Sequence, residues 1–354
     1  MFSFGSSKSA IGLDVGTYSV KMVHMKKGSA EPQILSFGIA QFPHEGAVAS
    51  DGQIVDPNAV SEVIKELFKS SKVKPANVVT CLSNQNIISR FIKVPMMADN
   101  ELEEAVKYEA EQYVPYALDE MNLSFYKLSQ VEEDGIAQHF ILLVCAQKDI
   151  LKNFLNTLKN AAVTPQIVDV DNLAIINALE KAIRPDEVTA IIDIGASSTN
   201  INIIKEGVLK FTRNILIAGN NITNAIMNVL KLDFAQAENI KTEEVVVSTS
   251  EDSEDNDVSE VVRSIIEELA SEIRRSFDYY KAQHREHTIN RILLSGGTAK
   301  LKNLDVFLAN ELGVEVEKAN PLEGIVANVA NVDQLNEHLL ELTAAIGLAL
   351  REVM

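Results

Sequence analysis

The chain lacks the features that would place it in an oxidising compartment, across a membrane or on a nucleic acid. It has two cysteines, Cys81 and Cys145, each in an apolar stretch, which argues against a disulfide framework and favours a reducing cytosol. Its 32 Lys and Arg are outnumbered by 50 Asp and Glu, giving a net charge of −18. Nucleic acids and anionic lipids require clustered basic residues instead, so we expect neither as a ligand.

Long apolar runs are also missing. The longest, at 140–146 and 344–350, are far shorter than the about 18 residues that a membrane span needs. The first residues, MFSFGSSKSA, have no sustained apolar core, so we expect no signal peptide. The sequence therefore predicts a cytoplasmic protein that meets a membrane only through partners.

Two common nucleotide-binding motifs are absent as well. Neither a Walker A sequence nor GxGxxG occurs, which excludes P-loop and Rossmann sites. The 46% hydrophobic and 23% charged residues are enough to bury sizeable cores, and 354 residues suggest two domains or one two-lobed domain.

A repeated segment organises the chain. Residues 11–28, IGLDVGTYSVKMVHMKKG, align with residues 190–207, AIIDIGASSTNINIIKEG. Each copy predicts an apolar strand, a DxG turn with small hydroxyl residues, and a second, alternating strand. The matching residues are Asp14, Gly16, Lys26 and Gly28 in the first copy and Asp193, Gly195, Lys205 and Gly207 in the second.

The composition of these turns suits an anion. The glycine lets the backbone bend tightly, and the residues after it offer amide and hydroxyl donors. A carboxylate beside them would repel a bare phosphate, so we expect Mg²⁺ next to Asp14 and Asp193, contacted directly or through water. A single DxG would be an ordinary type I turn, but two facing copies could hold a nucleoside triphosphate. The predicted binding residues are Gly16, Thr17, Tyr18, Ser19, Lys21, Gly195, Ala196, Ser197, Ser198 and Thr199.

A third glycine element lies downstream. In RILLSGGTAK, residues 291–300, an apolar strand ends at Gly296 and Gly297, followed by Thr298. A double glycine at the end of a buried strand permits the close approach of adenine and ribose at the carboxyl edge of a sheet. A plain strand-to-helix turn is the alternative.

The order of these motifs, DxGT, DxG with a Ser/Thr cluster, then SGGT, resembles the actin-like ATPase superfamily, whose members include MreB and FtsA. RFIKVPMM at 90–97, followed by ELEEAVKYEAEQYVPYALDE at 101–120, is similar to the PilM proteins of type IV pilus assembly. The resemblance implies an α/β fold with two lobes, duplicated and ribonuclease H-like, with an inserted FtsA-type 1C subdomain. It also implies ATP and Mg²⁺ as cofactors, with at most slow ATPase activity.

The resemblance implies four subdomains: 1A (1–76, 166–187 and 333–354), 1C (77–165), 2A (188–220 and 290–332) and 2B (221–289). Within 1C, the residue pattern predicts strands at about 78–81, 87–92 and 139–146 and helices at about 101–113 and 150–161. Relatives use this insert for protein contacts, although a plain structural insert is the alternative.

Three further residues gain roles from the resemblance. Asp171, at the start of a helix within 168–179, would face the γ-phosphate and orient the attacking water. Alternatively, it is an acid favoured at a helix N-terminus. Glu238 and Lys241 in QAENIK match the AExxK helix start that contacts ribose. Their spacing puts them on one helix face, as it would in a solvated ion pair.

The implied function is that of an adaptor. PilM proteins bind the cytoplasmic N-terminal peptide of PilN between the first lobe and the insert, beside other pilus platform and motor proteins. ATP would shift the population of lobe arrangements. The alternative function is that of an FtsA- or MreB-like protein that forms filaments, so self-association into homo-oligomers is also an open expectation. A small-molecule kinase is the third alternative. Pro95, Met96 and Met97 are the candidates for the peptide groove, with a structural turn as the alternative.

Overall fold

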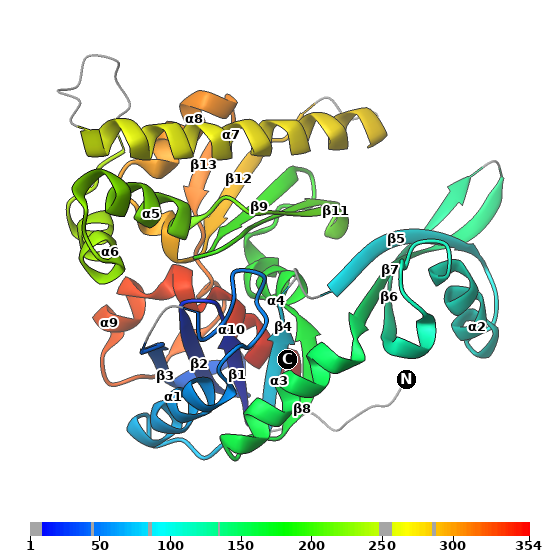
Figure 1. Ribbon diagram of the computed structural model, residues 1–354. Helices are drawn as coiled ribbons and strands as arrows, with labels where there is room; N and C mark the ends of the chain where they lie inside the picture. The colour runs from blue at the N-terminus through cyan, green and yellow to red at the C-terminus, as the bar shows by residue number, and fades with distance from the viewer. Residues whose placement is uncertain (1–8, 44–45, 84–86, 134, 248–256, 285–287) are drawn as a thin grey trace.

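The computed structural model describes residues 9–43, 46–83, 87–133, 135–247, 257–284 and 288–354, which form three β-sheets and their helices (Figure 1). The first sheet has the strand order β14-β3-β2-β1-β4-β8. β1, β2 and β3 form an antiparallel meander, and β4 and β8 continue the sheet in parallel. Its strands are β1 (Ser9–Val15), β2 (Ser19–Lys26), β3 (Gln33–Gln41), β4 (Val78–Leu82), β8 (Pro165–Val170) and β14 (Val326–Ala327).

The second sheet repeats this topology, with the order β11-β10-β9-β12-β13. Again a three-strand meander is followed by two parallel strands, β12 and β13. The repeat in the sequence therefore corresponds to β1–β2 in one sheet and β9–β10 in the other. The strands are β9 (Val188–Ile194), β10 (Thr199–Lys205), β11 (Val208–Ile215), β12 (Arg291–Ser295) and β13 (Glu315–Lys318).

Helices cover both faces of the first sheet, which explains why its inner strand β4, between β1 and β8, is buried throughout. α1 (Pro57–Ser70) and α3 (Lys148–Asn160) pack on one face and share a core with β1 and β2. α4 (Asp171–Leu179) and α10 (Leu339–Val353) pack on the other. Asp56 caps α1 by accepting from the backbone N–H groups of Asn58 and Ala59.

α4 and α10 lie between the two large sheets (Figure 1). α10 contacts β1 and β2 of the first sheet and β12 of the second. The two helices approach closely at Gly347, where a Cβ atom would lie 1.7 Å from the carbonyl oxygen of Ala174. A larger residue there would push the helices apart, so glycine is required by the close packing.

The outer face of the second sheet carries the remaining large helices. The long helix α7 crosses over this sheet (Figure 1), and its apolar stripe is buried as its periodicity predicts. The helices of this lobe are α5 (Gly219–Leu230), α6 (Phe234–Glu243), α7 (Asp257–His284) and α8 (Leu304–Leu312), with the 3-10 turn η4 (Gly297–Lys300); α9 (Val332–Glu337) precedes α10.

The third sheet has three antiparallel strands in the order β5-β7-β6 and lies beside β11 (Figure 1). α2 covers one face, with Leu102 and Val106 in a core shared with the strands. Lys210 of β11 places its Nζ atom 5.4 Å from the ring centre of Phe140 in β7. The elements are β5 (Ile87–Pro95), α2 (Asp99–Ala110), η2 (Leu118–Glu120), β6 (Met121–Glu133) and β7 (Ile136–Gln147).

Residues 77–165, the predicted insert, contribute both to this sheet and to the first lobe. β4 pairs with β1 and β8 in the first sheet, and α3 packs against α1. The three-stranded module therefore spans residues 87–147, and it includes β6, which the sequence pattern did not predict. The division of the whole chain into four subdomains stays a prediction.

Cys81 and Cys145 are free, buried thiols in different sheets, as expected. Burial raises the pKa of both thiols, that of Cys81 well above its ordinary value. Among the described residues, no helix is both long enough and apolar enough to cross a membrane.

Candidate functional site

The two DxG turns have the same local geometry. In the turn after β1, the N–H of Gly16 donates to the carbonyl of Ser19 at 3.1 Å. In the turn after β9, the N–H of Gly195 donates to the carbonyl of Ser198 at 3.0 Å. The repeat seen in the sequence is therefore a repeat of turn structure as well.

These turns also contact each other directly. Ser197 Oγ donates to Thr17 Oγ1 at 2.9 Å, which joins the second large sheet to the first. Asn220, in the first turn of α5, donates from Nδ2 to Ser197 Oγ at 3.2 Å, and its N–H donates to the carbonyl of Ala196 at 2.7 Å. The structure thus brings together the two predicted anion-binding turns, with hydroxyl groups at their meeting point.

Charged groups flank this contact. Lys21 Nζ lies 3.2 Å from Asp14 Oδ2, and the two side chains are only 16% and 15% exposed. Burial alone would lower the pKa of Lys21, but the charge of Asp14, helped by Glu341 and Asp193, raises it. Burial raises the pKa of Asp193 to about 6, opposed by a hydrogen bond from Ser295 and supported by the charge of Asp14.

Asp193 should make the stability of the ligand-free protein depend on pH. Its pKa is about 6 in the folded chain and 3.8 for an ordinary Asp, so the folded state holds more protons between these values. The free energy of unfolding should therefore fall by about 2.4 kcal/mol as the pH rises from about 4 to about 7. Urea unfolding of wild type and Asp193→Asn over this range isolates the effect. A difference between the two proteins that stays constant with pH would contradict it.

The third glycine element lies against the second turn. Gly296 has φ +87°, and a Cβ atom there would lie 2.3 Å from the carbonyl oxygen of Ile194. Thr298 Oγ1 donates to the carbonyl of Gly195 at 2.7 Å, and the N–H of Gly219 donates to the same oxygen at 3.1 Å. One carbonyl group therefore ties the turn, η4 and the start of α5 together.

Glu238 and Lys241 form a buried pair next to this point. Their charged atoms are 2.6 Å apart, and the Lys241 side chain is 6% exposed. Lys241 also donates to Thr223 Oγ1 at 2.9 Å and to the carbonyl of Gly219 at 3.4 Å. Burial lowers the pKa of Lys241, and Glu238 opposes this shift. A solvated ion pair is therefore the wrong interpretation, because the pair lies under the first turn of α5.

Three other residues predicted to bind nucleotide, Tyr18, Thr199 and Ser19, lie around these groups. The Tyr18 ring lies 6.3 Å from that of Phe234 in α6, and burial, with Glu238 and Glu341, raises the pKa of Tyr18. Thr199 Oγ1 donates to the carbonyl of Ile217 at 2.7 Å, so this hydroxyl is engaged within its own lobe. Ser19 is buried at the start of β2.

Asp171 is the first residue of α4, between the large sheets. Its Oδ1 accepts from the N–H of Asn172 at 2.8 Å, and its Oδ2 accepts from Asn200 Nδ2 at 3.2 Å. Besides burial, the charges of Asp14 and Asp171 both raise the pKa of Cys81 in β4. Its role in hydrolysis stays a prediction.

The candidate groove residues Pro95, Met96 and Met97 lie at or just after the end of β5, away from the first lobe. β5 starts at Ile87, opposite Ala146, next to the first lobe, and it ends at Pro95, opposite Gln138. At about 3.3 Å per residue, its ends are roughly 26 Å apart. The structure therefore puts these residues, with Met96 43% exposed, at the end of the sheet that is remote from the first lobe. Their part in partner binding stays a prediction.

Glu341, in the first turn of α10, was missed by the sequence analysis. Its Oε1 accepts from Lys300 Nζ at 2.7 Å, and a Cβ atom on Gly297 would lie 3.4 Å from its γ-carbon. No local motif marks this residue, because only the docking of α10 brings it to the site. Gly219 and Asn220 were missed too, although AGNN after a strand is a recognisable helix start.

Comparisons with known proteins agree with this geometry. The family model described as type IV pilus assembly protein PilM matches residues 12–353. A chain of a solved PilM–PilN type IV pilus biogenesis complex is 30% identical to this chain. The match covers 99% of this chain and 99% of that chain, with a TM-score of 0.87. Cell division protein FtsA of Streptococcus pneumoniae is 24% identical over 94% of this chain and 80% of its own.

The fold is shared more widely. MreB5 of Spiroplasma citri bound to AMPPNP covers 96% of this chain and 95% of its own, at 15% identity and a TM-score of 0.51. These matches confirm the actin-like ATPase fold that the two DxG turns and SGGT predicted. Because the family model spans nearly the entire chain, this protein belongs to the type IV pilus assembly protein PilM family.

Proposed function

We propose that this chain is a cytoplasmic ATP-binding adaptor of the type IV pilus inner-membrane platform, and that it binds the cytoplasmic N-terminal peptide of PilN. The observation that carries this proposal is the match to the PilM–PilN complex over 99% of the chain. Other platform and motor proteins would then assemble on the same adaptor, which would reach the membrane through PilN.

The site supports nucleotide binding by residues of both lobes. Thr17 and Ser197 would give up their mutual hydrogen bond and donate to phosphate oxygens, with the turn amides beside them. Asp14 and Asp193 would hold Mg²⁺ mainly through water, which suits an ion that keeps much of its hydration shell. Among the described residues, no three His, Cys, Asp or Glu are grouped to hold a metal on their own. Metal would therefore bind together with the nucleotide.

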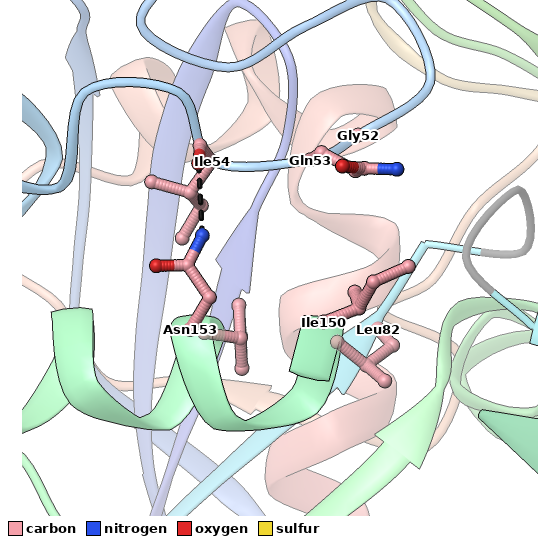
Figure 2. A pocket seen from close by; sticks show the side chains of 7 residues that line it. Gly52, Gln53, Ile54, Leu82, Ile150 and Asn153 are labelled. Carbon is pink, nitrogen blue, oxygen red and sulfur yellow. Dashed lines mark hydrogen bonds between the residues drawn. The ribbon is translucent and has the colours of Figure 1, made fainter. Parts of the chain in front are cut away.

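A small cavity marks a place where a peptide could enter (Figure 2). Its volume is about 20 Å³, and it lies between the turn at Gly52–Ile54 and the start of α3. Leu82, at the end of β4, closes it where the chain leaves for the third sheet, and Asn153 Nδ2 donates to the carbonyl of Ile54 at 2.9 Å. The space holds about one water, so an apolar peptide side chain would have to move the turn away from α3.

Calorimetry with a synthetic PilN N-terminal peptide tests the adaptor function. We expect saturable binding to wild type, and Ile150→Glu should weaken it at least about tenfold, because it replaces an apolar side chain that lines the cavity with an unpaired charge. Asn156→Glu is the matched control, since it adds the same charge on the exposed side of α3. A wild-type protein that does not bind the peptide would refute the adaptor, whereas equal binding by both variants would refute only this location.

β11 offers a route by which nucleotide could act on partner binding. Thr212 of β11 hydrogen-bonds Asn172 of α4, and Lys210 of the same strand contacts Phe140 in the third sheet. A cavity of about 290 Å³ between β11 and the start of β5 leaves room for the strands to shift. Closure of the lobes on ATP would therefore move the insert, which is a population switch between two arrangements.

Filament formation is the second candidate, favoured by the FtsA match over 94% of this chain. Electron microscopy and light scattering with ATP and Mg²⁺ distinguish it from the adaptor, because an adaptor should remain dispersed under conditions in which a filament protein assembles.

A further inference from the structure

A row of polar side chains runs across the second large sheet beneath α4. Asn214 of β11, Asn200 of β10 and Asp193 of β9 are direct partners in the strand register, so they share one face of the sheet. Asn202 and Thr212 are partners in a second row on this face. Asn200 and Asn202 are 4% and 0% exposed, so their amides need hydrogen-bond partners inside the protein.

The first row ends on Asp171. Asn214 Nδ2 donates to Asn200 Oδ1 at 2.7 Å, and Asn200 Nδ2 donates to Asp171 Oδ2 at 3.2 Å. An amide has its acceptor on one side and its donors on the other, so the bond from Asn214 turns the donor of Asn200 toward the carboxylate. Since the N–H of Asn172 holds Oδ1, both oxygens of Asp171 have a donor in a defined direction.

The hydrogen bonds of the second row are made with Asn172, the next residue of α4, rather than with the Asp171 side chain. Asn172 Nδ2 donates to Thr212 Oγ1 at 2.7 Å, and Thr212 Oγ1 donates to Asn202 Oδ1 at 2.9 Å. Asn202 Nδ2 returns to Asn172 Oδ1 at 3.3 Å, which closes a ring. This ring fastens α4 to the sheet and provides an internal comparison for the first row.

The two halves of the repeat have different residues opposite the aspartates of their DxG turns. Lys21 stands opposite Asp14 in the first half, as Asn200 stands opposite Asp193 in the second. Lys21 forms an ion pair with its own aspartate, whereas Asn200 donates to Asp171 on α4. A neutral donor can fix the direction of a carboxylate without cancelling its charge, which a residue that orients water must keep.

We propose that Asn200, oriented by Asn214, is a positioning residue that holds the Asp171 carboxylate in line for the water that attacks the γ-phosphate. This inference rests on the proposed nucleotide-binding function and on the role in hydrolysis predicted for Asp171, and it adds the residues that set the geometry of that step. It predicts that Asn200 acts only through Asp171.

The test measures ATP affinity and single-turnover hydrolysis for wild type, Asp171→Asn, Asn200→Ala and the double variant. Asn200→Ala should slow hydrolysis about tenfold to a hundredfold, while the Kd for ATP changes by less than about threefold. The double variant should be no slower than Asp171→Asn, because both changes remove one function. Asn202→Ala, which breaks the ring, should lower the melting temperature but keep the rate per folded molecule within about threefold.

The remaining outcomes of this test each bear on a different claim, either the positioning role of Asn200 or the nucleotide-binding function. An unchanged rate in Asn200→Ala, or rate losses that multiply in the double variant, would overturn the positioning role. If Asn200→Ala does not fold, the half-buried Asn214→Ala decides, since it frees the Asn200 amide to rotate and should slow hydrolysis in the same direction. A wild type that binds ATP without hydrolysing it overturns this inference alone, and one that binds no ATP overturns the proposed nucleotide function.

Discussion

Replacing Asp14 by alanine is expected to weaken Mg²⁺·ATP binding roughly a hundredfold, which corresponds to about 2.7 kcal/mol. The variant removes one of the two carboxylates that would hold the hydrated metal. It also leaves the ammonium group of Lys21, 16% exposed, without its partner at 3.2 Å. Removal of one member of a buried ion pair should lower the free energy of unfolding by about 2–4 kcal/mol. Calorimetric titration with ATP and urea unfolding measure the two effects.

A surface ion pair provides the control for the stability effect. Glu62 and Lys65 on α1 are 2.5 Å apart, but their side chains are 65% and 42% exposed. Because water screens this pair, Glu62→Ala should cost less than about 1 kcal/mol and leave ATP binding unchanged. Asp14→Ala should also lower the pKa of Asp193, since the charge of Asp14 helps to raise it. Wild-type ATP affinity in Asp14→Ala would refute the nucleotide site.

Gly296→Ala is expected to destabilise the protein by about 3–4 kcal/mol, a large effect for a single methyl group. The residue has φ +87°, and the new Cβ atom would lie 2.3 Å from the carbonyl oxygen of Ile194. That carbonyl belongs to β9, in the middle of the second sheet, so it cannot move without disturbing the ladder. The N–H of Gly296 also donates to the carbonyl of Leu340 at 3.0 Å, so the shift would reach α10. Urea unfolding measures the loss.

Gly313→Ala separates the steric clash from backbone strain. Gly313 ends α8 with φ +64°, and a Cβ atom there would have no neighbour within 4 Å. This control should therefore cost only about 1 kcal/mol, the strain of a left-handed residue. Equal losses in the two variants would show that close packing against β9 does not matter at Gly296.

The parts of the site that the sequence predicted are those whose signal is local. The DxG turns and the double glycine each follow an apolar strand, so strand, turn and donors appear within a few residues. The spacing of Glu238 and Lys241 likewise predicted one helix face, and the structure adds that the face is buried. The strand β6, which lies at the edge of its sheet, was not predicted, although Met121, Leu123 and Phe125 alternate with polar residues at its start.

The predicted groove residues show a second kind of information that the sequence did not supply, namely which end of a strand faces the first lobe. Pro95, Met96 and Met97 were placed at the edge of the insert, but the sequence does not say which edge faces the first lobe. The pairing of β5 with β7 decides this, and it puts Pro95 opposite Gln138 rather than next to α3. Strand register depends on side-chain packing across the sheet, which a single segment cannot specify.

The sequence by itself determined the duplicated lobes, the two DxG turns and the likeness to PilM, because repeats and glycine positions are properties of short segments. Tertiary structure alone decided that Ser197 meets Thr17, that Glu341 reaches the site from α10, and that Asn200 holds Asp171. These contacts join residues far apart in the chain, so they exist only once the two sheets pack around α4 and α10. Burial then converts ordinary side chains, such as Lys241 and Asp193, into groups with shifted pKa values.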